Sequence, residues 1–358
     1  CQNEAQLAGV IAHEIGHITA RHTAKRYTKT VGTNVLLQVL NVFSKNNYVN
    51  NLLGQSAQLY LLSYSRSQEY EADKLAVRYM SRAGFDPNEM ARFLSLMERY
   101  SILQRKILRM DKNVSELLKT HPNSSKRVNE VVSGYKGRIP LNPIVGKDIF
   151  LKKIDGITYG HKADEGFFIK NSFVHKPLRI KFDFDKEFYF LNKPNALIGS
   201  TNKKTKIIFD LDDSDKINDL KYIAKWLNIS QKKFTDFESF TSNGFNVFKT
   251  KVKKNKQLFV IATLKGNKNL IYRFILLTDD QELKNYESKF NNLLNTFSNI
   301  QDDELNKLQP PIIKIVTSSS QKNFKERLIN NLNIQSKHSE QLFNTINDIQ
   351  NDEIDTER

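Results

Sequence analysis

The sequence predicts an α+β protein in which a mostly helical first part precedes a mainly antiparallel sheet. Residues 1–135 carry apolar side chains at helical spacing and several signals for helix starts and stops. After Lys136, short aromatic-rich runs alternate with glycine, proline and asparagine, a pattern typical of strands and turns. We therefore expect a helical domain over 1–135, an α+β domain over 136–300, and a small segment with a polar tail over 301–358.

Several start and stop signals define the expected helices of the first part. Asn3 and Gln6 resemble a capping box at the start of a helix over 3–27. This helix has an apolar stripe, which consists of Leu7, Val10, Ile11, Ile15 and Ile18. Further helices are expected over 32–44 and from Ser56 to a stop at Gly84. Asp86, Pro87 and Glu89 form the start signal of a helix over 86–100. A short helix is expected before Thr120, and the last helix is expected within 120–135, with a stop at Gly134.

The second part contains runs whose apolar residues alternate or cluster as they do in strands. Strands are expected within 166–175, 178–184, 187–191, 206–211, 245–252, 257–264 and 269–277, with helices over 215–228 and 280–297. Gly266 and Asn267 lie between the last two runs and predict a hairpin. The connector 137–146, punctuated by glycine and proline, separates the two parts.

Charge and composition limit the classes of partner. The chain has 55 Lys and Arg against 39 Asp and Glu, a formal net charge of +16, which could favour nucleic acid, lipid headgroups or cell-wall polymers. Because the lysines are scattered among asparagines and form no basic stripe, we expect no nucleic-acid partner, and only weak cell-wall or membrane-surface association. The single cysteine, Cys1, excludes an internal disulfide and a thiolate zinc cluster.

The sequence offers no start region in which a signal peptide could be judged, and it contains no clear membrane span. No uncharged apolar run reaches transmembrane length, and the nearest candidate, residues 31–43, predicts a buried or surface-lying helix. The chain does not begin with methionine, and its first residues already have a helical pattern. We therefore expect a fragment or a processed form.

The stretch HEIGHITARH, residues 13–22, carries the clearest chemical signal. His13 and His17 are one helical turn apart, so both imidazoles can reach one ion. Glu14 lies beside the first histidine, where it could take a proton from an attacking water, as in the H-E-x-x-H pattern of zinc peptidases. The alternative interpretation is a solvated helix face that happens to carry histidine and glutamate.

A metal site of this kind requires a third ligand. The class with a third histidine ten residues after the first is excluded, because Thr23 occupies that position. His22 misses that position by one residue and lies off the face of the histidine pair on a regular helix, which predicts either a structural role or support of a metal ligand from outside the ligand set. The later segment 65–76 offers three carboxylates, which are Glu69, Glu71 and Asp73.

Two of these carboxylates share one helix face. Glu69 and Asp73 are four residues apart, whereas Glu71 points elsewhere. If Glu69 binds the metal, Asp73 can reach the other ring nitrogen of a ligating histidine and fix its tautomer.

HEIGHITARH, followed by SRSQEYEAD (65–73) and THPNSSKR (120–127), resembles the HtpX-like and prenyl-protease-like zinc metallopeptidases, the forty-eighth metallopeptidase family. The resemblance covers residues 1–135 and implies one Zn²⁺ per chain. It implies that His13, His17 and Glu69 hold the metal and that Glu14 is the general base.

The same resemblance assigns roles to residues beyond the metal ligands. It places His121 near the metal as a reversible fourth ligand or a donor to the oxyanion, and Arg127 as a second oxyanion donor. Asp73 is expected to support a ligating histidine. Arg66 is expected either to orient the ligands or to form an ordinary salt bridge.

The implied fold is a mostly helical gluzincin-type metallopeptidase domain that lacks the N-terminal sheet usual in the family. The α+β domain has no implied role, and residues 312–349 fit a degenerate LysM-like module only weakly. The implied activity is peptide-bond hydrolysis in envelope protein quality control, on polypeptides that include misfolded envelope proteins. The implied location is the periplasm, or a membrane-associated position, in a Gram-negative bacterium. The alternatives are a zinc-retaining chaperone with little proteolysis and a cell-wall-anchoring module.

Overall fold

The computed structural model describes ten stretches of the chain. These are residues 1–25, 64–108, 121, 125–201, 205–213, 219–254, 257–266, 269–317, 323–335 and 338–349. The expected helix over 32–44 and the short helix before Thr120 lie outside the described residues. The chain forms two compact units, the first from 1–106, 110–155 and 341–358 and the second from 107–109 and 156–340.

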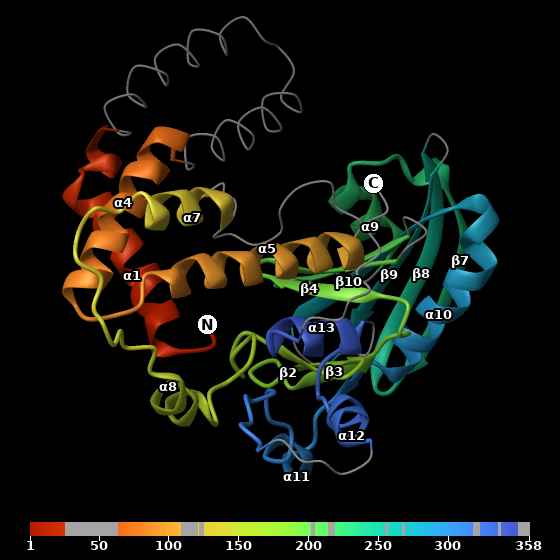
Figure 1. The fold of residues 1–358 in the computed structure, drawn as a ribbon. Helices are drawn as coiled ribbons and strands as arrows, with labels where there is room; N and C mark the ends of the chain where they lie inside the picture. Colours follow the sequence, from red (N-terminus) through yellow and green to blue (C-terminus); the bar gives the residue numbers. More distant parts are fainter. Residues whose placement is uncertain are drawn as a thin grey trace, which may run out of the picture. The chain divides into compact units, whose positions relative to one another are not determined.

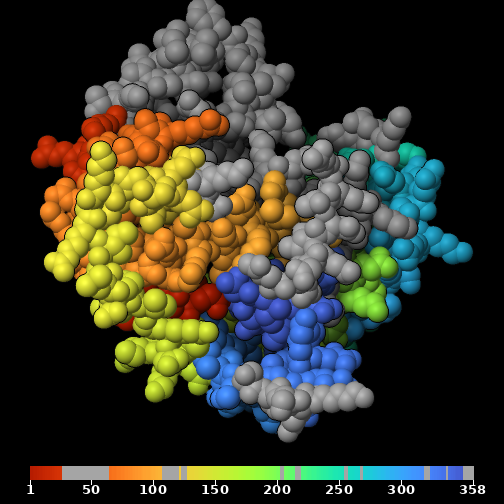
Figure 2. All heavy atoms as spheres, in the orientation of Figure 1, coloured from red at the N-terminus to blue at the C-terminus, as the bar shows by residue number. Residues whose placement is uncertain are grey.

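Helices from the first 155 residues build most of the first unit (Figure 1). They are α1 (Glu4–Thr19), α4 (Arg66–Arg82), α5 (Asn88–Leu108), α7 (Ser125–Ser133) and α8 (Lys147–Ile154). Helix α1 packs along α4, and α7 also contacts α4. The segment from α7 to α8, yellow in Figure 2, forms part of the surface of this unit.

The start of α1 has the cap that the sequence predicts. The Asn3 side chain accepts a hydrogen bond from the backbone N–H of Gln6 at 2.8 Å. The reciprocal bond differs from a capping box, because the Gln6 side chain accepts from the backbone of Gln2. Asn3 and Gln6 also donate to the buried carboxylate of Glu89, which ties the start of α1 to α5.

Helix α4 begins later than the sequence suggests and ends as expected. Ser65 and Gln68 form a capping box at its start, so the helix does not run continuously from Ser56. It ends before Gly84, whose φ of +87° is a left-handed conformation that favours glycine. The start of α5 is also confirmed, since the Asp86 side chain accepts from the backbone N–H of Asn88 at 2.9 Å.

The apolar stripe on α1 does not form the core of this unit. Ile11 is 50% exposed and Ile18 is 72% exposed, and the rest of the stripe is also partly or largely exposed. The buried face consists instead of Ala5, Gln6, Gly9, Ala12, His13, Gly16 and His17. Small residues are selected there because α1 and α4 approach closely, and a branched side chain would hold them apart.

Gly16 marks the closest approach. A Cβ at this position would lie 2.9 Å from the backbone oxygen of Ala72 and 3.2 Å from its Cα. These distances leave no room for a methyl group unless one backbone shifts. Gly16 lies between His13 and His17 along α1, and Ala72 lies between Glu69 and Asp73 along α4, so this contact brings the two polar sets together.

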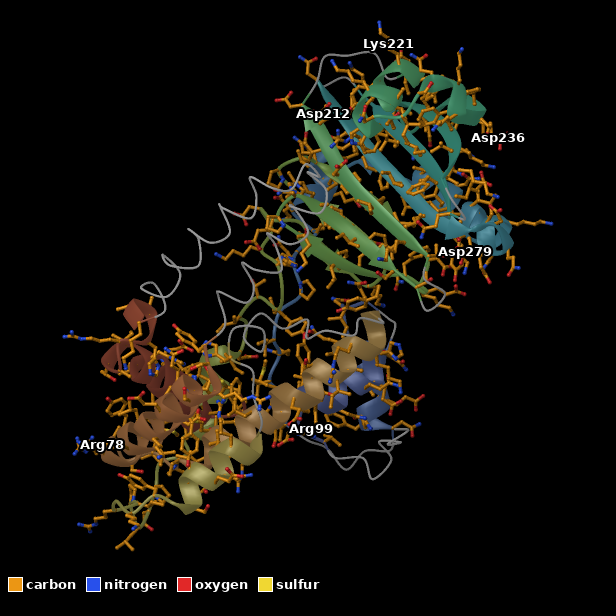
Figure 3. All side chains as sticks on the ribbon, turned by 90° about the horizontal axis from the view of Figure 1, so that it is seen from above. Arg78, Arg99, Asp212, Lys221, Asp236 and Asp279 are labelled. Carbon is orange, nitrogen blue, oxygen red and sulfur yellow. The ribbon has the colours of Figure 1, made fainter. Side chains whose placement is uncertain are left out.

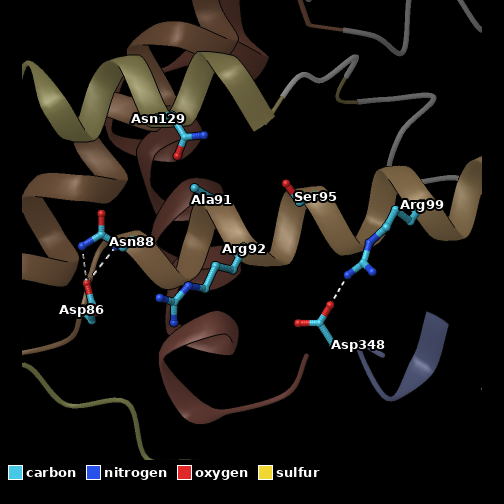
Figure 4. A pocket seen from close by; sticks show the side chains of 8 residues that line it. All are labelled: Asp86, Asn88, Ala91, Arg92, Ser95, Arg99, Asn129 and Asp348. Carbon is cyan, nitrogen blue, oxygen red and sulfur yellow. Dashed lines mark hydrogen bonds and ion pairs between the residues drawn. The ribbon is translucent and has the colours of Figure 1, made fainter. Parts of the chain in front are cut away.

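The connector after α7 belongs to the first unit. Val145 accepts from the backbone N–H of Ala5 at 3.0 Å, and Ile144 forms a parallel bridge with Phe85. Helix α8, which the sequence analysis did not predict, follows directly. The C-terminal segment also contacts this unit, where Asp348 pairs with Arg99 on α5 (Figure 4).

Two antiparallel sheets build the second unit, which confirms the predicted α+β class. The larger has the order β4-β5-β6-β10-β9-β8-β7, and the smaller has the order β1-β2-β3-β11. The bounds in the larger sheet are β4 Tyr189–Lys193, β5 Ala196–Ser200, β6 Lys206–Asp213, β7 Phe234–Ser242, β8 Phe245–Lys254, β9 Gln257–Lys265 and β10 Leu270–Asp279. Those in the smaller are β1 Phe167–Ile169, β2 Ser172–His175, β3 Ile180–Asp183 and β11 Ser298–Asn299.

Helices cover the larger sheet through alternating strand residues. On β9, Val260 and Ala262 belong to the core beneath α10 (Leu283–Thr296), and Ile261 belongs to the core beneath α9 (Leu220–Leu227). Figure 3 shows Asp212 near the end of β6, Lys221 on α9, and Asp236 on the edge strand β7. The predicted β9–β10 hairpin pairs as expected, with Phe274 opposite Ala262.

The strand prediction was wrong in two ways: one predicted run is divided into two strands, and three strands were not predicted. The run 166–175 is two strands, because Lys170 adopts φ +51° in the turn between β1 and β2. Strands β5, β7 and β11 were missed. β7 is an exposed edge strand with polar residues on both faces, so it lacks the apolar alternation on which the prediction relied.

Two 3₁₀ turns, Gln231–Lys233 and Asp280–Glu282, precede β7 and α10. Three short helices follow β11 toward the C-terminus, and they are α11 (Asp302–Leu305), α12 (Phe324–Asn330) and α13 (Ser339–Ile346). The LysM-like interpretation of this region stays a prediction. In the described part of the chain, no helix is long and apolar enough to cross a membrane.

Gly16→Ala should destabilise the first unit by about 1–3 kcal/mol, because the added methyl group forces α1 away from Ala72. A loss of stability would be informative, because helix propensity alone predicts that alanine stabilises a helix relative to glycine by about 1 kcal/mol. Thermal unfolding of the full chain measures the change. Ile18→Ala on the exposed side of α1 is the matched control, expected within about 0.5 kcal/mol of wild type. An unchanged or raised unfolding temperature for Gly16→Ala would contradict the close-packing argument.

Candidate metal centre

Four side chains from distant parts of the chain converge on one point in the first unit. They are His13 and His17 on α1, Glu69 on α4, and His121. One ligand atom from each lies within 4.8 Å of every other. His13, His17 and Glu69 are buried, and His121 is only 13% exposed. The predicted ligands His13, His17 and Glu69 are therefore brought together.

The spacing of these atoms fits a four-coordinate metal. His17 Nε2 lies 3.0 Å from His13 Nε2 and 3.3 Å from Glu69 Oε1, and His13 Nε2 lies 3.6 Å from Glu69 Oε2. His121 Nδ1 lies 3.3 Å from His13 Nε2 and 3.0 Å from Glu69 Oε1. A tetrahedron with bonds of about 2.0–2.1 Å has edges of roughly 3.3 Å. The residues present therefore fit a metal ion held by nitrogen and oxygen.

Carboxylates and an arginine surround the ligand set. His13 Nδ1 lies 2.9 Å from Asp73 Oδ1, so the ring contacts a carboxylate on the side away from the ligands. Arg127 donates from Nη2 to Glu69 Oε2 at 3.2 Å and from Nε to Asp73 Oδ2. The family resemblance implied Arg127 at an oxyanion, whereas here its Nε and Nη2 donate to the two carboxylates of α4. Asp73 lies where the sequence placed it.

Glu14 lies beside the ligand set without belonging to it. Its side chain is 46% exposed, and Oε1 lies 3.4 Å from His121 Nε2. The carboxylate is thus close to the cluster and accessible to solvent, as a group that exchanges protons with water requires.

Arg66 is not brought to the centre. It is exposed at the start of α4, and within the described ranges no ion pair joins it to Glu69, Asp73 or the histidines. Its predicted role in orienting the ligands therefore has no support in this arrangement.

His22 and Tyr64 both contact His17; support of a metal ligand was one of the two roles expected of His22, whereas no role was expected of Tyr64. The expected helix over 3–27 ends at Thr19, and Arg21 adopts φ +56°, so the chain turns and brings His22 Nδ1 to 2.8 Å from His17 Nδ1. The Tyr64 ring stacks on His17 with the centroids 3.8 Å apart. A left-handed arginine leaves no reliable signal in a sequence, which is why His22 seemed to lie off the ligand face.

The buried charges shift one another's pKa values. Burial alone lowers the pKa of His13, but the carboxylates of Asp73 and Glu69 outweigh it and raise that pKa to about 9. Burial lowers the pKa of His17. Burial alone would raise the pKa of Glu69, yet hydrogen bonds from His121, His13 and His17 hold it well below its usual range. At neutral pH the metal-free centre thus holds an ionised Glu69 and a His13 ring that is protonated on both nitrogens.

Comparison with known families agrees with this geometry. Residues 1–134 match the sequence profile described as Peptidase family M48. These residues belong to peptidase family M48. The match confirms the resemblance drawn from the three motifs, and it covers the helices that carry the candidate centre.

Relatives within this M48 segment include two proteins from distant organisms. The mitochondrial metalloendopeptidase OMA1 of Saccharomyces cerevisiae is 33% identical over 131 residues, covering 37% of this chain and 36% of that protein. The Beta-barrel assembly-enhancing protease of Yersinia pestis is 32% identical over 137 residues, covering 36% of this chain and 27% of that protein. The chain thus spans about a third or less of the length of these relatives.

One solved structure resembles part of the chain only distantly. The cyanobacterial PsbP protein of Synechocystis is 12% identical, covers 38% of this chain and 96% of its own, and has a TM-score of 0.29. A likeness at this level carries no argument about function.

Metal affinity of the centre should rise with pH until about 9. Because the raised pKa keeps His13 protonated in the metal-free protein, an incoming ion must displace that proton below pH 9. Between pH 7 and 9 the apparent affinity should increase by up to roughly tenfold per pH unit, then level off. Competition with a chromophoric chelator measures the affinity, after correction for protonation of the chelator. An affinity that stays flat between pH 7 and 9 would contradict a proton held on His13.

Proposed function

We propose that the chain is a zinc-dependent metalloendopeptidase of the gluzincin type. The convergence of His13, His17 and Glu69, whose facing nitrogen and oxygen atoms lie 3.0 to 3.6 Å apart, carries the proposal. Two imidazoles and a carboxylate suit zinc, which leaves one position for a fourth ligand. Zinc, when bound there, would supply a Lewis acid that polarises a carbonyl oxygen and acidifies a water molecule.

The remaining chemistry belongs to residues of the chain. Glu14, next to His13 and half-exposed, would accept the proton of the attacking water and deliver it to the nitrogen of the leaving amine. Arg127 would hold Glu69 and Asp73 in place through its two donors, and Asp73 would orient the His13 ring. A direct role of Arg127 at the oxyanion stays part of the proposal derived from the family resemblance.

His121 would act as a latch. Its Nδ1 lies at the fourth corner of the ligand set, 3.3 Å from His13 Nε2, and its Nε2 faces Glu14. A histidine in this position occupies the space that a water or a substrate carbonyl needs. The enzyme would therefore have to move His121 aside before cleavage. The alternative is that His121 stays in place as a donor to the oxyanion, and the two roles predict opposite effects when the imidazole is removed.

Family membership and the named relatives support a role in protein quality control. We propose polypeptide substrates, misfolded envelope proteins among them, and a periplasmic or membrane-associated location in a Gram-negative bacterium. The Yersinia relative, described as Beta-barrel assembly-enhancing, motivates the envelope assignment.

A zinc-retaining chaperone is the second candidate function. The exposed stripe of Leu7, Ile11, Ile15 and Ile18 offers an apolar surface that could hold unfolded polypeptide without cutting it. Suppression of aggregation of a denatured client, with wild type and Glu14→Gln compared, separates the two functions. A chaperone protects the client equally with both proteins and releases no fragments with either.

Glu14→Gln should bind zinc as wild type does and lose casein cleavage by at least about 100-fold, because the amide cannot accept the water proton. Elemental analysis measures bound zinc, and release of labelled casein fragments measures cleavage. Glu69→Ala is the matched control, since it removes a ligand and should lower zinc as well as cleavage. Cleavage retained by Glu14→Gln would rule out Glu14 as the general base.

His121→Ala should raise the initial rate of casein cleavage several-fold, because it frees the fourth corner of the ligand set. Bound zinc should remain near one per chain, because three ligands are left. A loss of cleavage with zinc retained would instead assign His121 to the oxyanion and exclude the latch.

A further inference from the structure

A continuous chain of contacts runs from the candidate metal centre to the surface of the first unit. His17 Nε2 faces the ligand set, and His17 Nδ1 lies 2.8 Å from His22 Nδ1. His22 Nε2 lies 3.1 Å from Glu71 Oε2. Glu71 is thus linked to His17 through one intervening imidazole.

His22 is built into this position. It is fully buried, at 0% exposure, although its ring can carry a charge. Both of its ring nitrogens have partners, which satisfies the ring without water. The left-handed turn at Arg21 is uncommon for a residue with a side chain, and it is what directs His22 back beneath His17.

Hydrogen-bond chemistry gives this chain of contacts one direction. The Glu71 carboxylate only accepts, so His22 must donate from Nε2. A neutral His22 then has a lone pair on Nδ1, which accepts from the N–H at Nδ1 of His17. His17 is left with its lone pair on Nε2, the nitrogen that faces Glu69 and His13.

We propose that Glu71 and His22 are positioning residues that hold His17 in the tautomer and orientation required of a metal ligand. The inference rests on the proposed function insofar as it requires a metal at this centre. His22 contacts the ligand set at Nδ1 of His17, and Glu71 reaches it through His22, so both act through His17 and neither is a catalytic residue.

The two histidine ligands would therefore be supported differently. His13 contacts Asp73 directly at 2.9 Å, whereas His17 reaches its carboxylate only through His22. Asp73 is buried, but the Glu71 side chain is 53% exposed. The support of His17 thus ends at a surface carboxylate that can be replaced without disturbing the core.

Glu71→Lys reverses the direction of the chain. A lysine ammonium only donates, so His22 would accept at Nε2 and carry its proton on Nδ1. His17 Nδ1 would then have to accept, which places the proton on Nε2 and removes the metal's lone pair. We expect zinc affinity to fall by about 10–100-fold, the usual effect of losing such a supporting partner.

His22→Gln separates this effect from the added positive charge. The amide oxygen of glutamine can accept from His17 Nδ1 whatever residue occupies position 71. If His22 passes the direction of hydrogen bonding from residue 71 to His17, Glu71→Lys should lower zinc affinity much less when His22 is replaced by glutamine. The loss in the His22→Gln background should be at least about tenfold smaller than the loss in the native background. Coulomb repulsion alone predicts the same loss in both backgrounds.

Zinc competition with a chelator is measured for wild type, both single variants and the double variant. As a second measurement, which does not depend on His22→Gln folding, ¹⁵N-labelled histidine reports the tautomers of the seven rings by long-range ¹H–¹⁵N NMR. His22 should carry its proton on Nε2 in the wild type and on Nδ1 in Glu71→Lys.

Equal losses in both backgrounds, or a His22 ring that keeps its Nε2 proton in Glu71→Lys, would overturn the positioning role. In that case wild-type zinc binding and cleavage leave the proposed peptidase function intact. A wild-type chain that binds no zinc would overturn the proposed function first, and the role of Glu71 with it.

Discussion

The close packing of α1 on α4 is the constraint on which the candidate centre depends. Gly16 sits against the backbone of Ala72, where even one methyl group would lie 2.9 Å from a carbonyl oxygen. Only at this separation can the Glu69 carboxylate reach both His13 and His17. The glycine inside the H-E-x-x-H stretch is therefore as necessary to the geometry as the ligands on either side of it.

Bringing several ionisable groups into one buried site is unfavourable unless each has a partner. Here every buried member has one: Glu69 faces three histidines and Arg127, Asp73 faces Arg127 and His13, and His17 faces His22. The result is a cluster in which side chains of the protein itself orient the candidate metal ligands.

In the second unit, the pattern of apolar residues predicted strands that are covered on both faces but not the exposed edge strand. Strands whose residues alternate between two covered faces, such as β9 and β10, were predicted with their hairpin. β7 was missed because it is an edge strand with solvent on both faces, and only its pairing with β8 makes it a strand. The division of the run 166–175 depended on a positive φ at Lys170, which its residue type does not favour.

The sequence by itself determined the chemistry: His13, Glu14 and His17 at one-turn spacing, Glu69 and Asp73 on one face of a later helix, and the helix starts at Asn3 and Asp86. These follow from local periodicity and local hydrogen bonds, which act within a few residues. Tertiary structure alone decided which face of α1 is buried, that Arg127 engages Glu69 and Asp73, and that His22 returns to His17. Those outcomes depend on backbone separation and on one left-handed residue, and contacts between segments distant in the chain leave no periodic trace in the sequence.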